Sequence, residues 1–290
     1  MIDWPEHLVN GIALRRSVLF LGAGISANST NDKGEHPKTW HQLLLELTDD
    51  LGPDTKGLVT AKINREDYLT ASELIFRKIG KDRFFDLLRK EFIRPAFQPN
   101  EFHKCIFQLD SRYVITPNID KIYEVYAQNS ANGTITVKNY YDSDLSRLLR
   151  SQDRYILKMH GTLDEPGKMI FTRLQYTLAR NDYASFYRLV EALIMNYTFV
   201  FLGAGIADPD IRLLMEDVAF TFPNGPKHYY VIPKNEISPD ELDIERESRN
   251  IEFIQFDNSK GDYSELLDGL KELVALVESQ REDIRESMNW

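Results

Sequence analysis

Seven short apolar runs recur along the chain, each about the length of a β-strand. Runs this continuous, rich in Val, Ile, Phe and Tyr, are typical of strands that helices cover on both faces, as in a parallel sheet. The pattern therefore predicts an α/β protein with a Rossmann-like, doubly wound and mostly parallel sheet. The runs occupy residues 18–21, 113–116, 155–159, 169–171, 199–202, 229–232 and 253–256.

Helical periodicity fills the segments between these runs. Thr39 and Gln42 have the spacing of a capping box, and apolar residues behind them fall on one helical face. Residues 66–94 read as two further helices, and Gly80 is the expected stop between them. The first two strands are thus separated by far more helix than a single crossover needs.

We expect one domain that covers residues 1–290. A helical insertion is predicted at about residues 52–104, and an amphipathic closing helix at about residues 262–285. The sequence EPGK at 165–168 has the Pro-Gly order of a type II turn. This turn is predicted to join two of the strands near a sheet edge.

The composition is that of an ordinary globular protein, with 42% hydrophobic and 28% charged residues. The net charge of -10 argues against direct binding of nucleic acid, because Lys and Arg that displace counterions drive such binding. Cys105 is the only cysteine, so neither an intramolecular disulfide nor a cluster of zinc-binding thiolates is expected. The sequence begins without a signal-peptide pattern, and no apolar run approaches the roughly 18 residues needed to cross a bilayer. We therefore expect a cytoplasmic protein.

The first apolar run leads directly into a glycine-rich turn. Gly22, Gly24 and Ala27 satisfy the spacing G-x-G-x-x-G/A, which allows a backbone to approach a pyrophosphate. A glycine turn after a buried strand would give the same letters. The acidic residue that a Rossmann dehydrogenase places about 20 residues later, after a second strand, is missing. A hydride-transfer dehydrogenase is therefore only a minor alternative.

The letters FLGAG occur twice, at residues 20–24 and 201–205. In the second copy Asp208 stands where the fingerprint requires a small residue, which argues against a second pyrophosphate site of the same kind. A duplicated domain is disfavoured, because neither the helical insertion nor the TPNID sequence repeats. We interpret the two copies as two edges of one ligand crevice.

Polar residues follow two other predicted strands. Thr116, Asn118 and Asp120 follow one, and His160 follows another. The carboxyl ends of parallel strands meet at one rim of the sheet, where open α/β sheets bind ligands. Singly, Asn118 and Asp120 could cap the helix that begins near Ile122, and His160 could be structural. Their joint occurrence with the first glycine turn favours a site.

Four motifs in this order resemble those of the sirtuin superfamily. The resemblance is greatest to a bacterial sirtuin-like branch found in phage-defence systems. A four-cysteine zinc module is absent, and so is the Pro-Asp-Phe-Arg loop of deacylating sirtuins, so deacylation of a peptide is not expected. The matching motifs are GAGIS at 22–26, TPNID at 116–120, KMHGTLDEPGKMIFT at 158–172 and FLGAGIADPDI at 201–211.

The resemblance implies NAD as substrate, with no zinc. It implies that Asn118 holds the ribose hydroxyls and orients water, that Asp120 binds the nicotinamide carboxamide, and that His160 is the general base. Asn118 and His160 are thus the predicted catalytic residues. The other predicted nucleotide-binding residues are Gly22, Ala23, Gly24 and Ser26 at the pyrophosphate, Thr116, and Gly203, Ala204 and Asp208 at the adenosine half.

The resulting expectation is an NAD hydrolase that releases nicotinamide and ADP-ribose and depletes NAD in anti-phage defence. Uncontrolled activity would kill the host, so we expect gating by homo-oligomer assembly or by a partner, for which the family suggests a HerA-type ATPase. Two alternatives from other classes are a non-catalytic sensor of NAD or ADP-ribose and a nuclease effector that acts with a partner ATPase.

Overall fold

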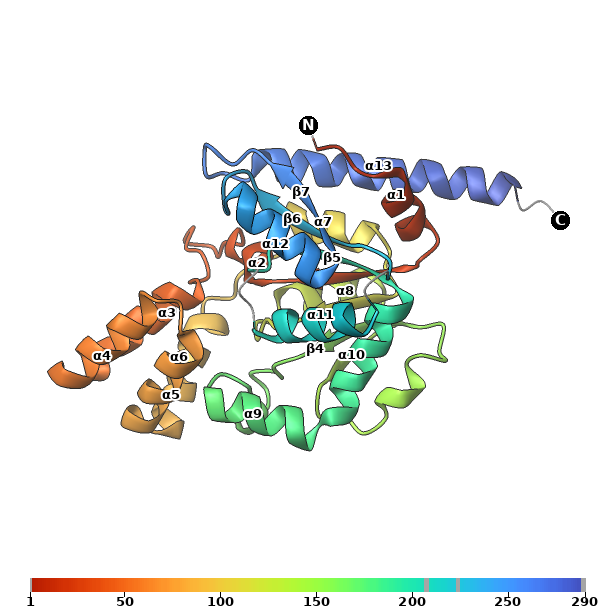
Figure 1. Ribbon diagram of the computed structural model, residues 1–290. Coiled ribbons are helices and arrows are strands. Elements are labelled where there is room, and N and C mark those ends of the chain that lie inside the picture. Colours follow the sequence, from red (N-terminus) through yellow and green to blue (C-terminus); the bar gives the residue numbers. More distant parts are fainter. Residues whose placement is uncertain (1, 206–208, 223–224, 288–290) are drawn as a thin grey trace.

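The computed structural model describes residues 2–205, 209–222 and 225–287. Its centre is a seven-stranded sheet with the order β3-β4-β2-β1-β5-β6-β7, and all neighbouring strands are parallel (Figure 1). The predicted doubly wound α/β class is confirmed. The strands are β1 (Ser17–Leu21), β2 (Tyr113–Thr116), β3 (Ile135–Asn139), β4 (Arg154–Lys158), β5 (Thr198–Leu202), β6 (His228–Pro233) and β7 (Ile251–Phe256).

The central strand β1 lies between β2 and β5. From β1 the chain adds β2 on one side, passes to the edge strand β3 and comes back to β4 between β3 and β2; it then crosses to β5 on the other side of β1. Leu21 at the end of β1 is opposite Leu202 at the end of β5. The carboxyl ends of these two strands therefore form the topological switch point, the usual ligand position in an open α/β sheet.

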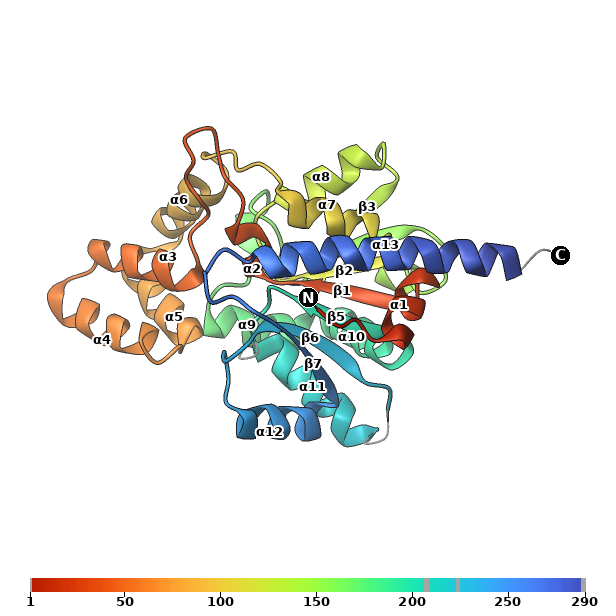
Figure 2. The ribbon, with the colours of Figure 1, turned by 90° about the horizontal axis from the view of Figure 1, so that it is seen from above.

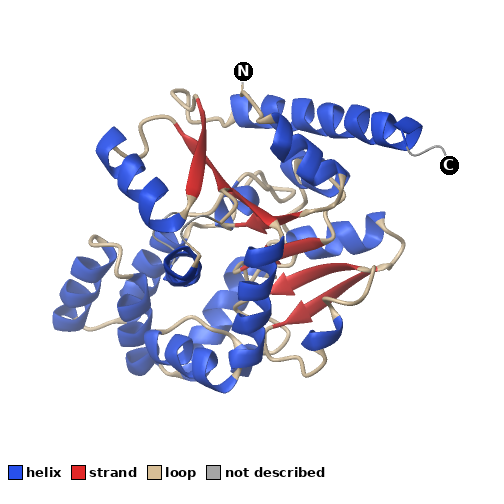
Figure 3. Ribbon diagram, turned by 45° about the vertical axis from the view of Figure 1, so that its right-hand side comes forward, coloured by secondary structure: helices blue, strands red, loops and turns tan. Residues whose placement is uncertain are grey.

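Helices cover both faces of the sheet (Figures 2 and 3). One face packs against α1 (Glu6–Ala13), α7 (Glu101–Gln108), α8 (Ile122–Ser130) and α13 (Ser264–Ser287). The other packs against α9 (Arg173–Asp182), α10 (Ala184–Asn196), α11 (Pro209–Thr221) and α12 (Pro239–Arg249).

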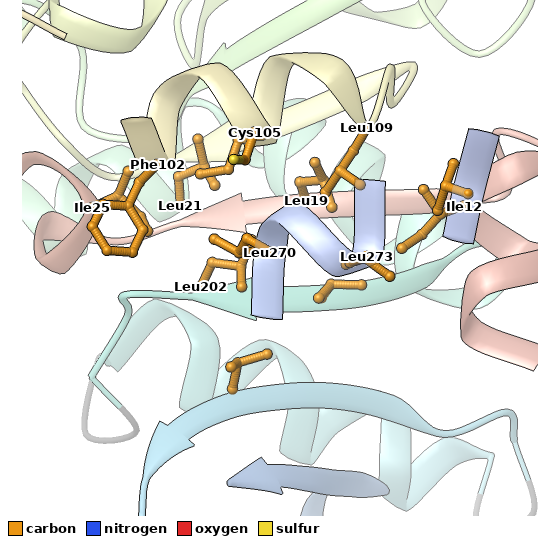
Figure 4. Close-up of a cluster of buried hydrophobic side chains, with 14 of the residues drawn as sticks. Ile12, Leu19, Leu21, Ile25, Phe102, Cys105, Leu109, Leu202, Leu270 and Leu273 are labelled. Carbon is orange, nitrogen blue, oxygen red and sulfur yellow. The ribbon is translucent and has the colours of Figure 1, made fainter. Parts of the chain in front are cut away.

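Alternation along each strand supplies both hydrophobic cores. In β1, Leu19 and Leu21 belong to one core, whereas Val18 and Phe20 belong to the other. Figure 4 shows Leu19 and Leu21 with α7 and with Leu270 of α13, all in the first of these cores. Because β1 is buried on both faces, its sequence is continuously apolar.

A group of helices between β1 and β2 has its own core and projects from one end of the sheet (Figures 1 and 2). The capping box of Thr39 and Gln42 is present at the start of α3 (Trp40–Leu47). Gly80 separates α5 (Tyr68–Ile79) from α6 (Lys81–Phe92), as predicted. The short helix α2 (Ala23–Ala27) precedes this group, which consists of α3 (Trp40–Leu47), α4 (Pro53–Ile63), α5 (Tyr68–Ile79) and α6 (Lys81–Phe92).

One strand prediction and one turn prediction were wrong. Residues 169–171 form no strand: Met169 and Phe171 pack into the core of the helical group, so tertiary burial explains their apolar character. The EPGK segment forms a 3-10 turn over Pro166–Lys168 rather than a turn between two strands. Conversely, β3 lies at the sheet edge and is partly exposed, so its sequence ITVKN lacks the apolar run used to find strands.

Two histidines are buried in neutral form. His228 at the start of β6 accepts a hydrogen bond at Nδ1 from the Phe199 amide, at 3.1 Å. His103 in α7 accepts one at Nδ1 from the Asn100 amide, also at 3.1 Å. Burial lowers the pKa of each imidazole from 6.5 to about 4.

Stability should therefore fall as the pH drops from 6.5 to 4. In this window the unfolded chain binds protons at these imidazoles and the folded chain does not, so each histidine contributes a slope of about 1.4 kcal/mol per pH unit. In His228→Asn the side-chain oxygen can accept the Phe199 hydrogen bond without titrating. Urea unfolding at several pH values should show a slope smaller by about one proton in this variant. Equal slopes for the two proteins would contradict the assignment of His228.

Candidate nucleotide and catalytic site

The two FLGAG segments meet backbone to backbone at the switch point. The Gly22 amide donates to the Leu202 carbonyl at 2.9 Å, and the Gly24 amide donates to the Gly203 carbonyl at 2.8 Å. A Cβ atom on Gly22 would overlap the Gly203 oxygen and the Cα of Ala204. Glycine is therefore required at position 22 for contact between the two turns.

The side of the turn that remains accessible is formed by Ala23 and Gly24, both of which are exposed. Gly203 and Ala204 at the end of β5 are partly exposed beside them. The structure thus brings the predicted pyrophosphate and adenosine segments together. The prediction for Asp208 lies outside the described residues.

Thr116 and Asn118 tie the end of β2 to the first glycine turn. The Thr116 hydroxyl donates to the Leu21 carbonyl at 2.7 Å and accepts from the Asn118 amide at 3.1 Å. The Asn118 side-chain amide donates to the Gly22 carbonyl at 3.1 Å and to the Ser26 hydroxyl at 3.4 Å. The partly exposed Asn118 therefore lies directly beside the turn, held by the Gly22 carbonyl and by the hydroxyls of Thr116 and Ser26.

Asp120 lies in the same pocket and also has a structural role. Its Oδ1 accepts a hydrogen bond from the Ile122 amide at 3.0 Å at the start of α8. It is 9% exposed and lines a small pocket with Ser26, Thr116 and Asn118. Asp120 therefore both caps the start of α8 and lines the pocket.

His160 follows the adjacent strand but packs elsewhere. In the β2–β4 register Thr116 is opposite Lys158, so Asn118 and His160 each lie two residues beyond paired positions. His160 is buried, and its ring packs edge-on against Tyr176 of α9, with 6.2 Å between centroids. Among the described residues, His160 is not one of those that line the pocket of Asn118 and Asp120. The strand ends converge as expected, but the three side chains do not share one described pocket.

Four ionisable residues in this pocket were not predicted: His103, Tyr123, Glu124 and Lys158. Lys158 directly follows the buried residues Tyr155, Ile156 and Leu157 of β4, which was a detectable signal. His103 belongs to a capping box with Asn100 and has no apparent signal for a site. Its Nε2 is buried without a hydrogen-bond partner in the described part of the chain.

No group of three or more potential metal-binding side chains occurs in the described ranges. No helix within those ranges is both long and apolar enough to cross a membrane.

The sheet order, the paired glycine turns and the polar strand ends define a doubly wound α/β protein with a candidate site at the switch point. Residues 112–254 match the family model of the SIR2-like domain. The predicted resemblance to the sirtuin superfamily is confirmed over this part of the chain.

Curated bacterial relatives match most of the chain at low identity. A protein named NAD(+) hydrolase ThsA from Cytobacillus dafuensis is 24% identical over 215 residues, which is 74% of this chain and 40% of the relative. A protein of the same name from Acinetobacter baumannii (strain 532279) is 25% identical over 229 residues, 78% of this chain and 44% of the relative. Defense-associated sirtuin 2 from Bacillus subtilis is 25% identical over 202 residues, 68% of this chain and 19% of the relative. The chain thus spans less than half the length of these relatives.

Replacement of Gly22 by Ala should destabilise the protein by about 1–3 kcal/mol, because the added methyl group must separate the two turns. Gly57→Ala is the matched control: its Cβ would meet nothing within 4 Å, and alanine in the interior of α4 should stabilise by about 1 kcal/mol. Urea unfolding measures both effects. A Gly22→Ala variant as stable as the unmodified protein would show that the turns can separate freely.

Proposed function

We propose that this protein hydrolyses NAD at the nicotinamide bond and releases nicotinamide and ADP-ribose. The observation that carries the proposal is the position of Asn118, whose side chain is hydrogen-bonded to the first glycine turn and shares a pocket with Asp120. The names of the relatives support the same chemistry.

The cleavage requires little acid catalysis. Nicotinamide leaves NAD as a neutral molecule, so no proton has to be delivered to it. The enzyme must hold the ribose, stabilise an oxocarbenium-like transition state and place a water molecule, as in glycoside cleavage. In the proposed mechanism Asn118 holds the ribose hydroxyls and orients water, and Asp120 binds the carboxamide. His160 acts as general base toward a ribose hydroxyl or the water.

The nucleotide would lie across the two glycine turns. The exposed Ala23 and Gly24 offer backbone to the pyrophosphate, with Ser26 below them. The amides of Gly22 and Gly24 already bond to the second turn, so their part is to shape the surface rather than to donate to phosphate. The adenosine half would contact Gly203, Ala204 and Asp208. Thr116 would support the opposite side of the site.

The biological setting in this proposal is anti-phage defence through depletion of NAD. The name of the B. subtilis relative, Defense-associated sirtuin 2, supports a role in defence. We propose that the whole chain acts as one SIR2-like domain in the cytoplasm, without zinc. A homo-oligomer or a separate protein, such as a HerA-type ATPase, would gate the activity. Light scattering and activity measurements with and without NAD would test whether the protein assembles and whether assembly controls its activity.

A non-catalytic sensor of NAD or ADP-ribose is the second candidate. The position of His160 against Tyr176, outside the pocket of Asn118 and Asp120, favours it. Tight binding of NAD without release of nicotinamide would distinguish this function from hydrolysis.

Substitution of either proposed catalytic residue should abolish the reaction. Nicotinamide release should fall at least about 100-fold in Asn118→Ala and in His160→Ala, because each removes a group that acts in the transition state. Asn181→Ala, on the exposed face of α9, is the control and should retain full activity. Chromatographic detection of nicotinamide measures the rates, and circular dichroism checks folding. Full activity in Asn118→Ala would exclude the proposed mechanism.

A further inference from the structure

A lysine is buried beneath the candidate site. Lys158 is the last residue of β4, and its side chain is only 1% exposed. Its Nζ donates to the backbone carbonyl of Asp120 at 2.6 Å and forms an ion pair with Glu124 Oε2 at 2.7 Å. The Glu124 side chain is 8% exposed, so both charges are removed from water.

We infer that Lys158 and Glu124 are positioning residues that fix the backbone segment 118–122. This inference rests on the proposed function, since that segment carries Asn118 and Asp120. Lys158 is in register with Thr116, so it reaches the segment from the neighbouring strand. Glu124 lies in the first turn of α8 and directs the ammonium group toward the Asp120 carbonyl.

Stability alone does not explain this pair. A buried ion pair can often be replaced by apolar residues of similar size without loss of stability, because the cost of dehydrating the charges offsets their attraction. The hydrogen bond to the Asp120 carbonyl is different, because an apolar residue cannot replace it. Two side chains of the segment reach distant partners: Asn118 bonds to Gly22 and Ser26, and Lys121 pairs with Asp164. The backbone amides of Asn118 and Ile122 have only local partners, the Thr116 hydroxyl and Asp120 Oδ1. Lys158 is therefore the donor that connects the middle of the segment to the sheet.

The double variant Lys158→Met/Glu124→Leu separates positioning from stability. Its melting temperature should stay within about 4 °C of that of the unmodified protein, whereas Lys158→Met alone should melt about 10 °C or more lower because Glu124 is left unpaired. Hydrogen exchange of the peptide that covers residues 116–122 should be at least about tenfold faster in the double variant, and peptides from β1 and β5 should not change.

Conservative replacement provides the matched control. Glu124→Gln keeps an acceptor for the lysine and leaves the bond to the Asp120 carbonyl in place, although the protein should melt at a lower temperature because the buried ammonium group loses its counter-charge. Exchange in 116–122 should then stay within about threefold of the unmodified protein. Nicotinamide release should fall about 100-fold in the double variant, since displacement of a positioning segment by about 1 Å is sufficient for such a loss.

Unchanged exchange of 116–122 in the double variant would overturn the inference, whatever the rate of NAD cleavage. Faster exchange confined to this peptide, together with slower cleavage, would support it. If no form of the protein cleaved NAD but exchange increased as described, the positioning role would stand and the proposed function would fail.

Discussion

The contact between the two glycine turns is the constraint on which the candidate site depends. Two backbone hydrogen bonds join the turns, and a side chain at position 22 would force them apart. Because the turns follow adjacent parallel strands, this contact forms at the one place where the sheet changes its direction of growth. The glycines of the motif are thus explained first by the fold and only then by a ligand.

The sequence was informative about the buried framework. Six of the apolar runs coincide with strands, because a strand covered on both faces must be apolar at every position. The edge strand β3 was not predicted, because its exposed residues need not be apolar. Residues 169–171 were wrongly predicted as a strand, because they are buried without joining the sheet. A run of apolar residues indicates that a segment is buried. It does not indicate whether neighbouring strands or packed helices bury it.

The candidate site was predictable where it follows strand ends and not where it depends on side-chain direction. Thr116, Asn118 and Asp120 gather as expected because the register of β1 and β2 places them there. The direction of His160 could not be deduced, since it depends on the turn after it and on the packing of Tyr176. The neutral His103 and the buried Lys158 come from elements whose proximity only the tertiary structure reveals.

The order of the strands also has a consequence for synthesis of the chain. β1 is made early but pairs on one side with β5, about 180 residues later, and Trp4 near the start bonds to the Gly269 carbonyl in α13. While the ribosome is still producing the second half, one edge of the most apolar strand has no partner. Pairing between strands so far apart in sequence slows folding, and until it is complete the chain exposes apolar surface that is prone to aggregation. The crevice between the two glycine turns therefore cannot form until β5 has been synthesised.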